Sequence, residues 1–309
     1  MITSIFRKST PLNYSLIIIL MLLFFFIFQF QDLSWFGSVI SIAEKVGLIG
    51  VISASFLLVN FIIKKNGLSK DSTFAMFFYL LFLLFFPDSL SKTDIVLANF
   101  FLLLALRRLL SLQSLKSSKE KIFDASLWIF VASLFQFWCI LFLILVFISI
   151  IFHVAGDYRN WFLPFIALFA VGTLFLAGAL YSEVDVVAYF QERAVIDVSI
   201  DYFIKDAQNW ALSIYFTVAL FFVFLLSATL SKRPMLLLAS YKKVIAYFFI
   251  AVFVFLLSPN KSNDLLVFTI APLSIIATSH IEFSQNRVNN EITLGVLVLC
   301  SIVLFFAQL

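Results

Sequence analysis

Charged side chains are scarce in this sequence. Asp, Glu, Lys and Arg together make up 12% of its 309 residues, whereas soluble domains contain about 25%. Hydrophobic residues make up 63%, so there is too little polar surface to cover a globule in water. This composition argues against a soluble fold and indicates a chain surrounded by lipid.

Cysteine, glycine and histidine are also rare, with two, eight and two residues. Cys139 and Cys300 both lie inside apolar runs, which argues against a disulfide framework or a thiolate metal site. So few glycines argue against a phosphate cradle built from loop amides. The sequence has no Walker loop, dinucleotide fingerprint, His-Glu-x-x-His or Gly-x-Ser-x-Gly motif, so the familiar motifs of soluble enzymes are absent.

The sequence is rich in apolar runs that approach or reach the length of a membrane helix, which needs about 20 apolar residues and at least about 17. These runs cover residues 14–30, 47–63, 72–87, 95–111, 125–136, 138–153, 161–181, 210–229, 244–258, 265–280 and 292–308. The first run follows Arg7 and Lys8, as in a signal peptide, but it is long enough to span and no small-residue cleavage site follows it. The predicted fold class is therefore all-α: a polytopic transmembrane helix bundle with about 11 spans and a single membrane domain over residues 1–309.

The stretch 126–153 is ambiguous in this scheme. As one helix, its 28 residues would be about 42 Å long at 1.5 Å per residue, too long for one untilted span and too short for two full ones. Gln136 is the only strongly polar side chain within it. We therefore predict a tight reentrant turn at Gln136, between two short helices.

The basic residues predict an orientation. With the N-terminus inside and a turn at Gln136, all but five of the 21 Lys and Arg residues fall in inner loops, as the positive-inside rule requires. Only Lys45, Lys92, Arg193, Lys205 and Lys261 remain outside. A single helix over 126–153 would instead move Lys232, Arg233, Lys242 and Lys243 outside. We predict a multi-pass membrane protein with its N-terminus inside and its C-terminus outside, and the net charge of +4 indicates no nucleic-acid partner.

Carboxylates gather on the predicted outer side. Asp32 directly follows the first run, Asp88 closes the third and Asp94 opens the fourth. At a water–lipid boundary they could act as a base toward an acceptor hydroxyl, or hold a divalent cation against a lipid phosphate. The alternative is that they cap or flank helix ends. No separate metal-ligand set is indicated.

Three outer loops have distinct content: residues 31–46, which we interpret as an interfacial helix, residues 87–94, and the long polar loop 182–209. Arg193 and Lys205 in the last loop are candidate phosphate-binding residues. The middles of the runs hold almost no ionisable side chain, which argues against an ion-coupled transporter.

Two resemblances concern the whole chain. The opening Met-Ile-Thr-Ser-Ile-Phe, with the segments Asn99-Phe-Phe-Leu-Leu-Leu-Ala-Leu-Arg-Arg108 and Phe123-Asp-Ala-Ser-Leu-Trp128, resembles an uncharacterised family of Bacteroidota inner-membrane proteins. That resemblance runs through most of the chain and implies only a location, the bacterial inner (cytoplasmic) membrane, which the chain would cross several times.

The order of features is also similar to that of the multi-span glycosyltransferases that use polyprenyl-phosphate sugars (the C-type fold). The similar features are Asp32 after the first run, Pro87 to Arg108, the short hairpin 125–153, and Pro259-Asn-Lys261 followed by Pro272. The paired acids of the first loop are reduced here to one Asp beside Gln31. The resemblance implies a lipid-linked sugar as partner, Asp32, Asp88 and Asp94 as catalytic residues, and Arg193 and Lys205 as substrate-binding residues.

Two alternatives stay open beside this enzyme hypothesis. One is a non-catalytic scaffold or accessory subunit of an envelope-assembly or secretion complex, which would have membrane-protein partners. The other is a lipid or small-solute transporter. The sequence therefore leaves open whether the protein is an enzyme.

Overall fold

The computed structural model describes residues 2–198, 206–259, 261–284 and 286–309, and within these ranges the regular structure is helical. The α-helices are α1 (Ile2–Phe6), α2 (Pro11–Gln29), α3 (Val39–Lys65), α4 (Phe74–Leu83), α5 (Thr93–Ser111), α6 (Ser118–Phe135), α7 (Leu143–His153), α8 (Arg159–Tyr181), α9 (Val186–Arg193), α10 (Asp206–Thr229), α11 (Met235–Leu257), α12 (Val267–Phe283) and α13 (Arg287–Gln308). Short 3₁₀ turns are η1 (Ser34–Gly37), η2 (Pro87–Leu90), η3 (Leu112–Ser114), η4 (Phe137–Phe142), η5 (Leu230–Lys232) and η6 (Asn263–Leu266).

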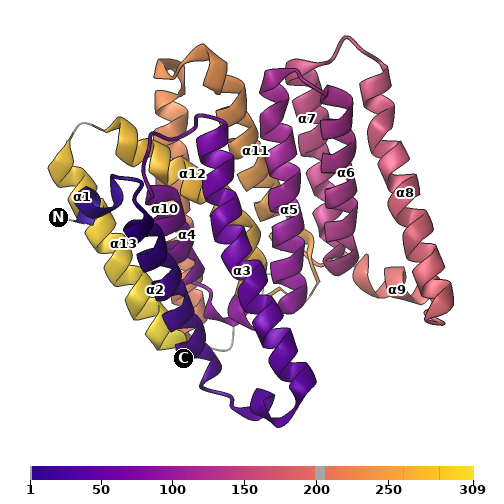
Figure 1. The fold of residues 1–309 in the computed structure, drawn as a ribbon, viewed down its shortest axis with the longest axis horizontal. Helices are drawn as coiled ribbons and strands as arrows, with labels where there is room; N and C mark the ends of the chain where they lie inside the picture. The colour runs from indigo at the N-terminus through magenta and orange to yellow at the C-terminus, as the bar shows by residue number, and fades with distance from the viewer. Residues whose placement is uncertain (1, 199–205, 260, 285) are drawn as a thin grey trace.

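The helices form a bundle in which the chain runs back and forth between two ends, and the N- and C-termini lie at opposite ends (Figure 1). Each of the eleven apolar runs corresponds to a helix. Among the described residues, eight helices are long and apolar enough to cross a membrane, while Phe74–Leu83 and Phe137–His153 are shorter apolar helices. The chain is thus an all-helical, multi-pass membrane protein.

The predicted break at Gln136 is present. Helix α6 ends at Phe135, Gln136 has an extended backbone (φ −131°, ψ 105°), and η4 begins at Phe137. The η4–α7 segment packs back against α6 (Figure 1). The stretch therefore folds as two short segments because one continuous helix would exceed the thickness of the bundle.

The predicted interfacial helix over 31–46 is wrong. This segment instead contains the single turn η1, after which α3 begins at Val39 and continues without a break for 27 residues. Ser38 caps the helix, because its Oγ accepts a hydrogen bond from the Ser41 backbone N–H at 3.1 Å. A capping Ser satisfies one of the unpaired N–H groups at a helix start, so α3 begins eight residues before the apolar run that we used to place it.

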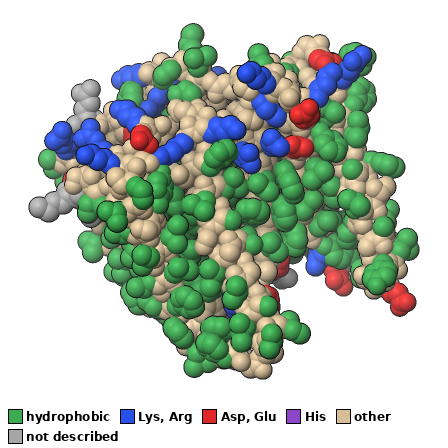
Figure 2. Space-filling view, viewed as in Figure 1, with side chains coloured by type: hydrophobic (Ala, Val, Ile, Leu, Met, Phe, Trp, Pro, Cys, Tyr) green, Lys and Arg blue, Asp and Glu red, His purple; other side chains and the backbone are tan. Residues whose placement is uncertain are grey.

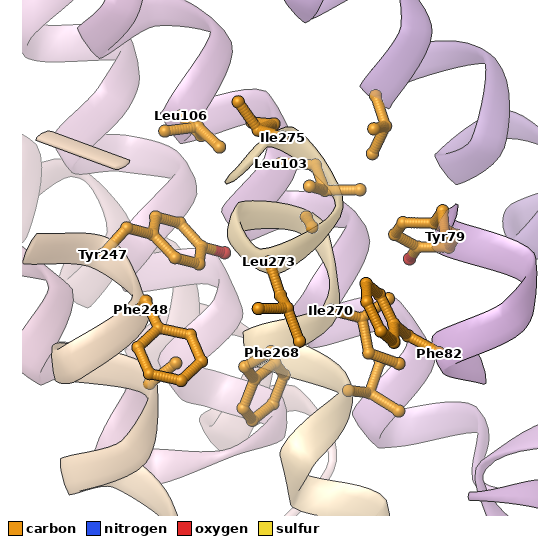
Figure 3. Close-up of a cluster of buried hydrophobic side chains, with 14 of the residues drawn as sticks. Tyr79, Phe82, Leu103, Leu106, Tyr247, Phe248, Phe268, Ile270, Leu273 and Ile275 are labelled. Carbon is orange, nitrogen blue, oxygen red and sulfur yellow. The ribbon is translucent and has the colours of Figure 1, made fainter. Parts of the chain in front are cut away.

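Helices α4 and α12 lie at the centre of the bundle. All ten residues of α4 are buried, and α12 packs against α4, α5, α10 and α11. Figure 3 shows Tyr79 and Phe82 of α4 and Tyr247 and Phe248 of α11 around the apolar side chains of α12. These two helices have no face left for lipid, so they form the core that positions both ends of the molecule.

A buried, non-helical segment follows α4. Proline disfavours a helical backbone in the residue before it, and Phe86 before Pro87 is indeed non-helical (φ −132°, ψ 68°). The freed backbone carbonyls are then satisfied by side chains from distant helices. Gln308 Nε2 donates to the Phe85 carbonyl at 3.0 Å, and Gln29 Nε2 donates to the Leu90 carbonyl at 2.9 Å. Such pairing is what irregular backbone needs inside a membrane bundle. The η2 turn also contacts η6.

Candidate functional site

The two ends of the bundle differ in charge. We call the end that holds α1 and the start of α13 the basic end, because Lys and Arg side chains gather across it (Figure 2). We call the opposite end, which holds η2, η6 and α9, the acidic end. The sequence-predicted site residues belong to the acidic end.

Asp88 is held in a polar junction at this end. It lies on η2 and is half-buried, and Gln208 Nε2 from the first turn of α10 donates to its Oδ2 at 2.9 Å. Asn263 Nδ2 on η6 donates in turn to the Gln208 backbone carbonyl at 3.0 Å. The predicted carboxylate is therefore engaged in joining η2, α10 and η6.

Asp264 is a further carboxylate at this end, which the sequence analysis did not single out. It is only 3% exposed, it lies on η6, and it is within electrostatic range of Asp88 and Asp94. Its Oδ1 is buried with no hydrogen-bond partner among the described residues. The local signal, an Asn-Asp pair before an apolar run, did not indicate burial.

Asp94 lies in the first turn of α5 and is exposed. The preceding Thr93 Oγ1 donates to Glu44 Oε1 at 3.0 Å, which joins the starts of α5 and α3. A carboxylate in the first turn interacts favourably with the helix dipole, so the position of Asp94 fits the helix-flanking alternative. Asp32 lies exposed in the connection between α2 and η1.

Of the two predicted phosphate-binding residues, the structure describes only Arg193. The Arg193 guanidinium lies over the Tyr189 ring at 3.9 Å, on a helix whose Tyr189 and Phe190 pack against Phe175 of α8. Asp88 belongs to the η2–α10–η6 junction instead. Lys205 lies outside the described residues. The described ranges also contain no group of three or more His, Cys, Asp or Glu that could hold a metal ion, so a divalent cation at the outer carboxylates has no ligand set in its favour.

A cavity of about 1320 Å³ opens at the basic end. It is lined by α1, the α3–α4 connection, the α10–α11 connection, the end of α12 and the start of α13. Five cationic side chains line it: Arg7, Lys8, Lys70, Arg233 and Arg287.

The cavity also has two carboxylates, and both are already engaged within the chain. Glu282 accepts hydrogen bonds from Ser69 Oγ at 2.7 Å, from the Lys70 backbone N–H at 2.8 Å and from Ser72 Oγ. Glu291 accepts from the Thr3 backbone N–H at 3.2 Å and from the Thr3 hydroxyl. None of the five cations forms an ion pair with a carboxylate in the described parts of the chain. The cavity therefore has an excess of unneutralised positive charge.

The chain belongs to a family of unknown function. The model of that family, described as "Family of unknown function (DUF6427)", matches residues 5–309. No curated protein and no solved structure matches the chain. Membership of an uncharacterised family is thus confirmed, and these comparisons give no support to a glycosyltransferase.

Arg233 is the most buried of the five cations that line the cavity: it is half-buried, and the other four are exposed. Its guanidinium lies 4.1 Å from the centroid of the Phe283 ring and 5.5 Å from that of Tyr241, and Nη2 donates to the Ser279 carbonyl at 3.1 Å. Burial lowers the pKa of Arg233, while Tyr241 and Glu282 act to raise it, and an arginine stays charged in proteins. Its Nε is buried and has no hydrogen-bond partner among the residues that the structure describes. The rings hold the guanidinium in place and leave donors for a ligand.

Sequence reasoning missed this cavity because it counted the same cations only as orientation signals. The lining residues come from positions near 7, 70, 233 and 287, and no local motif joins them. Only the packing of α1 against α13, and of α11 against α12, brings them to one place.

Proposed function

We propose that this protein is a multi-pass inner-membrane protein that binds a phosphate-bearing anionic ligand in the cavity at its basic end. The observation that carries the proposal is a cavity lined by five cations without ion pairs, beside two carboxylates whose oxygens already accept hydrogen bonds. An anion entering here gains charge-assisted hydrogen bonds without breaking an existing ion pair.

The chemistry of the cations favours phosphate. Arginine presents a planar fork of donors that matches phosphate oxygens, and lysine adds a point charge. Arg233 is half-buried and its guanidinium lies over two aromatic rings, so less side-chain entropy is lost when it binds a ligand than for a fully solvated arginine. A cation that serves only to orient the chain in the membrane would gain nothing from being held over aromatic rings.

We propose eleven crossings with the N-terminus inside. The eight long helices and the shorter α4, α6 and η4–α7 segments make eleven, and an odd number agrees with termini at opposite ends (Figure 1). The ten residues of α4 extend about 15 Å, so it crosses only because neighbouring helices and the η2 segment bury it. The positive-inside rule places the basic end in the cytoplasm.

The glycosyltransferase hypothesis has weaker support. It needs Asp32, Asp88 and Asp94 to be available to a substrate, whereas Asp88 is bound by Gln208 and Asp94 flanks a helix start. Its phosphate-binding residue Arg193 lies over Tyr189 on α9. The scaffold and transporter alternatives are not favoured by a specific contact.

Thermal stability in the presence of a phosphate probe tests the proposed function. The purified protein in neutral detergent is titrated with glycerol 3-phosphate, with chloride at equal ionic strength as reference. We expect Tm to rise with glycerol 3-phosphate only, because a ligand that binds the folded state stabilises it. The rise is expected to disappear in Arg233→Gln/Arg287→Gln and to persist in Arg107→Gln/Lys116→Gln, which removes the same charge from the basic end outside the cavity. An equal response of both variants, or no rise in the wild type, overturns the proposal.

The orientation has its own test. The two native cysteines are removed by Cys139→Ala and Cys300→Ala, and Ser91→Cys or Lys116→Cys is then introduced as the only cysteine. Spheroplasts with each variant are treated with a membrane-impermeant maleimide. We expect Ser91→Cys to be labelled at once and Lys116→Cys only after permeabilisation. The reverse pattern would place the basic end outside.

A further inference from the structure

An apolar stripe on α13 begins inside the basic-end cavity. Val288 and Ile292 line the cavity and are 65% and 59% exposed. Further along the helix, Val296, Leu299, Val303 and Phe306 are each more than half exposed. Their spacing of three or four residues places all six side chains on one side of the helix. The stripe thus connects the cationic cavity with the lipid-facing side of α13.

The cavity wall is itself amphiphilic. Beside the cations it includes exposed apolar side chains, those of Phe283, Val288 and Ile292, which are 43%, 65% and 59% exposed. A small water-soluble phosphate would bind the cations but would leave this apolar surface exposed to water. An amphiphile would cover both, and burying apolar surface is favourable at about 25 cal/mol per Å².

Resting on the proposed function, we propose that the ligand is a membrane lipid with an anionic phosphate headgroup, bound from the side of α13. Its phosphate lies against Arg233 and Arg287, and a hydrocarbon chain follows the stripe that starts at Val288 and Ile292. Charge complementarity fixes the headgroup, and the continuity of the stripe with the cavity fixes the direction of the chain.

The length of the stripe supports this arrangement. From Val288 to Leu299 the helix rises about 16 Å at 1.5 Å per residue, which matches one leaflet of a hydrocarbon core about 30 Å thick. Val303 and Phe306 continue the same face into the opposite leaflet. The protein therefore contains its own control positions, with equal exposure but no access to the cavity cations.

The first experiment measures lipid retained by the full-length protein. After purification from its native membrane in mild detergent and a delipidating wash, bound phospholipid is quantified by phosphorus content and mass spectrometry. We expect the wild type to retain an anionic phospholipid, and Arg233→Gln/Arg287→Gln to retain at least about tenfold less, since the loss of even one charge-assisted contact changes binding by about that factor. Arg107→Gln/Lys116→Gln should retain the wild-type amount. Equal retention by all three proteins overturns the inference.

The second experiment locates the hydrocarbon chain. A photo-crosslinking p-benzoylphenylalanine replaces Ile292 in one protein and Phe306 in another, both in nanodiscs of mixed anionic and neutral phospholipids. We expect adducts at position 292 to be enriched in the anionic lipid relative to the nanodisc, and to lose the enrichment in Arg233→Gln/Arg287→Gln. Adducts at position 306 should follow the bulk composition in both backgrounds. Bulk composition at position 292 overturns the inference.

These outcomes separate the inference from the proposed function. If glycerol 3-phosphate raises Tm but position 292 shows no enrichment, the cavity binds a water-soluble phosphate and the lipid inference fails alone. If glycerol 3-phosphate has no effect and neither retention nor enrichment depends on the two arginines, both fail.

Discussion

The two ends of this bundle use their charged residues differently. At the acidic end, Gln208 donates a hydrogen bond to the Asp88 carboxylate, and Lys261 Nζ lies 3.7 Å from an Asp197 carboxylate oxygen. At the basic end, the cations around the cavity have no such partner among the described residues, although others nearby do, such as Arg108 with Asp124 at 2.8 Å. The number of charges in a loop therefore identifies a face of the protein, but the pairing within the fold decides which charges are left for a ligand.

The ends also differ in how their backbone is satisfied. The basic end is built from ordinary helix ends and short turns, whereas the acidic end buries the irregular segment between α4 and α5 inside the bundle. This segment depends on side chains from the first and last long helices. We therefore expect the acidic end to control stability and the basic end to control binding.

The largest effect is expected from removing the glutamines that hold the acidic end. Gln29→Leu and Gln308→Leu each leave a buried carbonyl of the η2 segment without a donor, at a cost of about 1–3 kcal/mol apiece. The fall in Tm of the detergent-solubilised variants, relative to the wild type, measures this loss of stability. Gln31→Leu, the same change at an exposed position, is the control. If the double variant Gln29→Leu/Gln308→Leu unfolds at the temperature of the wild type, these side chains do not support the η2 segment and the contrast between the ends is wrong.

A smaller loss of stability is expected at the basic end from Glu282→Gln. The carboxylate accepts three hydrogen bonds from the 69–72 connection, and an amide can accept fewer, so we expect a cost of about 1–2 kcal/mol. Because the change also removes a negative charge beside Arg233, glycerol 3-phosphate should bind at least as well as in the wild type. Glu120→Gln, at an exposed acid in the first turn of α6 at the same end, should cost no more than the roughly 0.3–1 kcal/mol of a first-turn carboxylate and should leave phosphate binding unchanged. Weaker phosphate binding by Glu282→Gln would mean that the carboxylate itself contacts the ligand.

Asp94→Asn tests whether the acidic end is catalytic or structural. As a first-turn residue of α5, the carboxylate is expected to contribute about 0.3–1 kcal/mol through the helix dipole. The variant should therefore lose little stability, retain lipid normally and complement a deletion strain in full. Loss of complementation at normal protein abundance would restore the enzyme hypothesis for this end.

Much of the fold could be predicted because it depends on local hydropathy. All eleven apolar runs became helices, and Gln136 broke the one stretch that was too long for a single crossing. The early start of α3 was missed because a serine cap, not an apolar residue, decides it. The burial of Asp264 and the cavity could not be predicted, since each depends on which helices pack together: η2 on η6 in one case, and α1 on α13 in the other.

The smallest effect is expected from the exposed ion pairs at the basic end. A hydrogen bond from Lys64 lowers the pKa of Asp71, and the Arg159 backbone N–H, with Lys119, lowers that of Asp157. A lowered pKa stabilises the fold above the ordinary value of 3.8, and this contribution is lost as the pH falls through the lowered value. Asp71 is exposed and Asp157 is partly exposed, and salt screens both ion pairs, so the contribution is small. In low salt we expect Asp71→Asn/Asp157→Asn to lie slightly below the wild type in Tm near neutral pH and to converge with it below pH 3.8. A difference that persists in acid would show that these side chains stabilise the basic end by packing and not by charge.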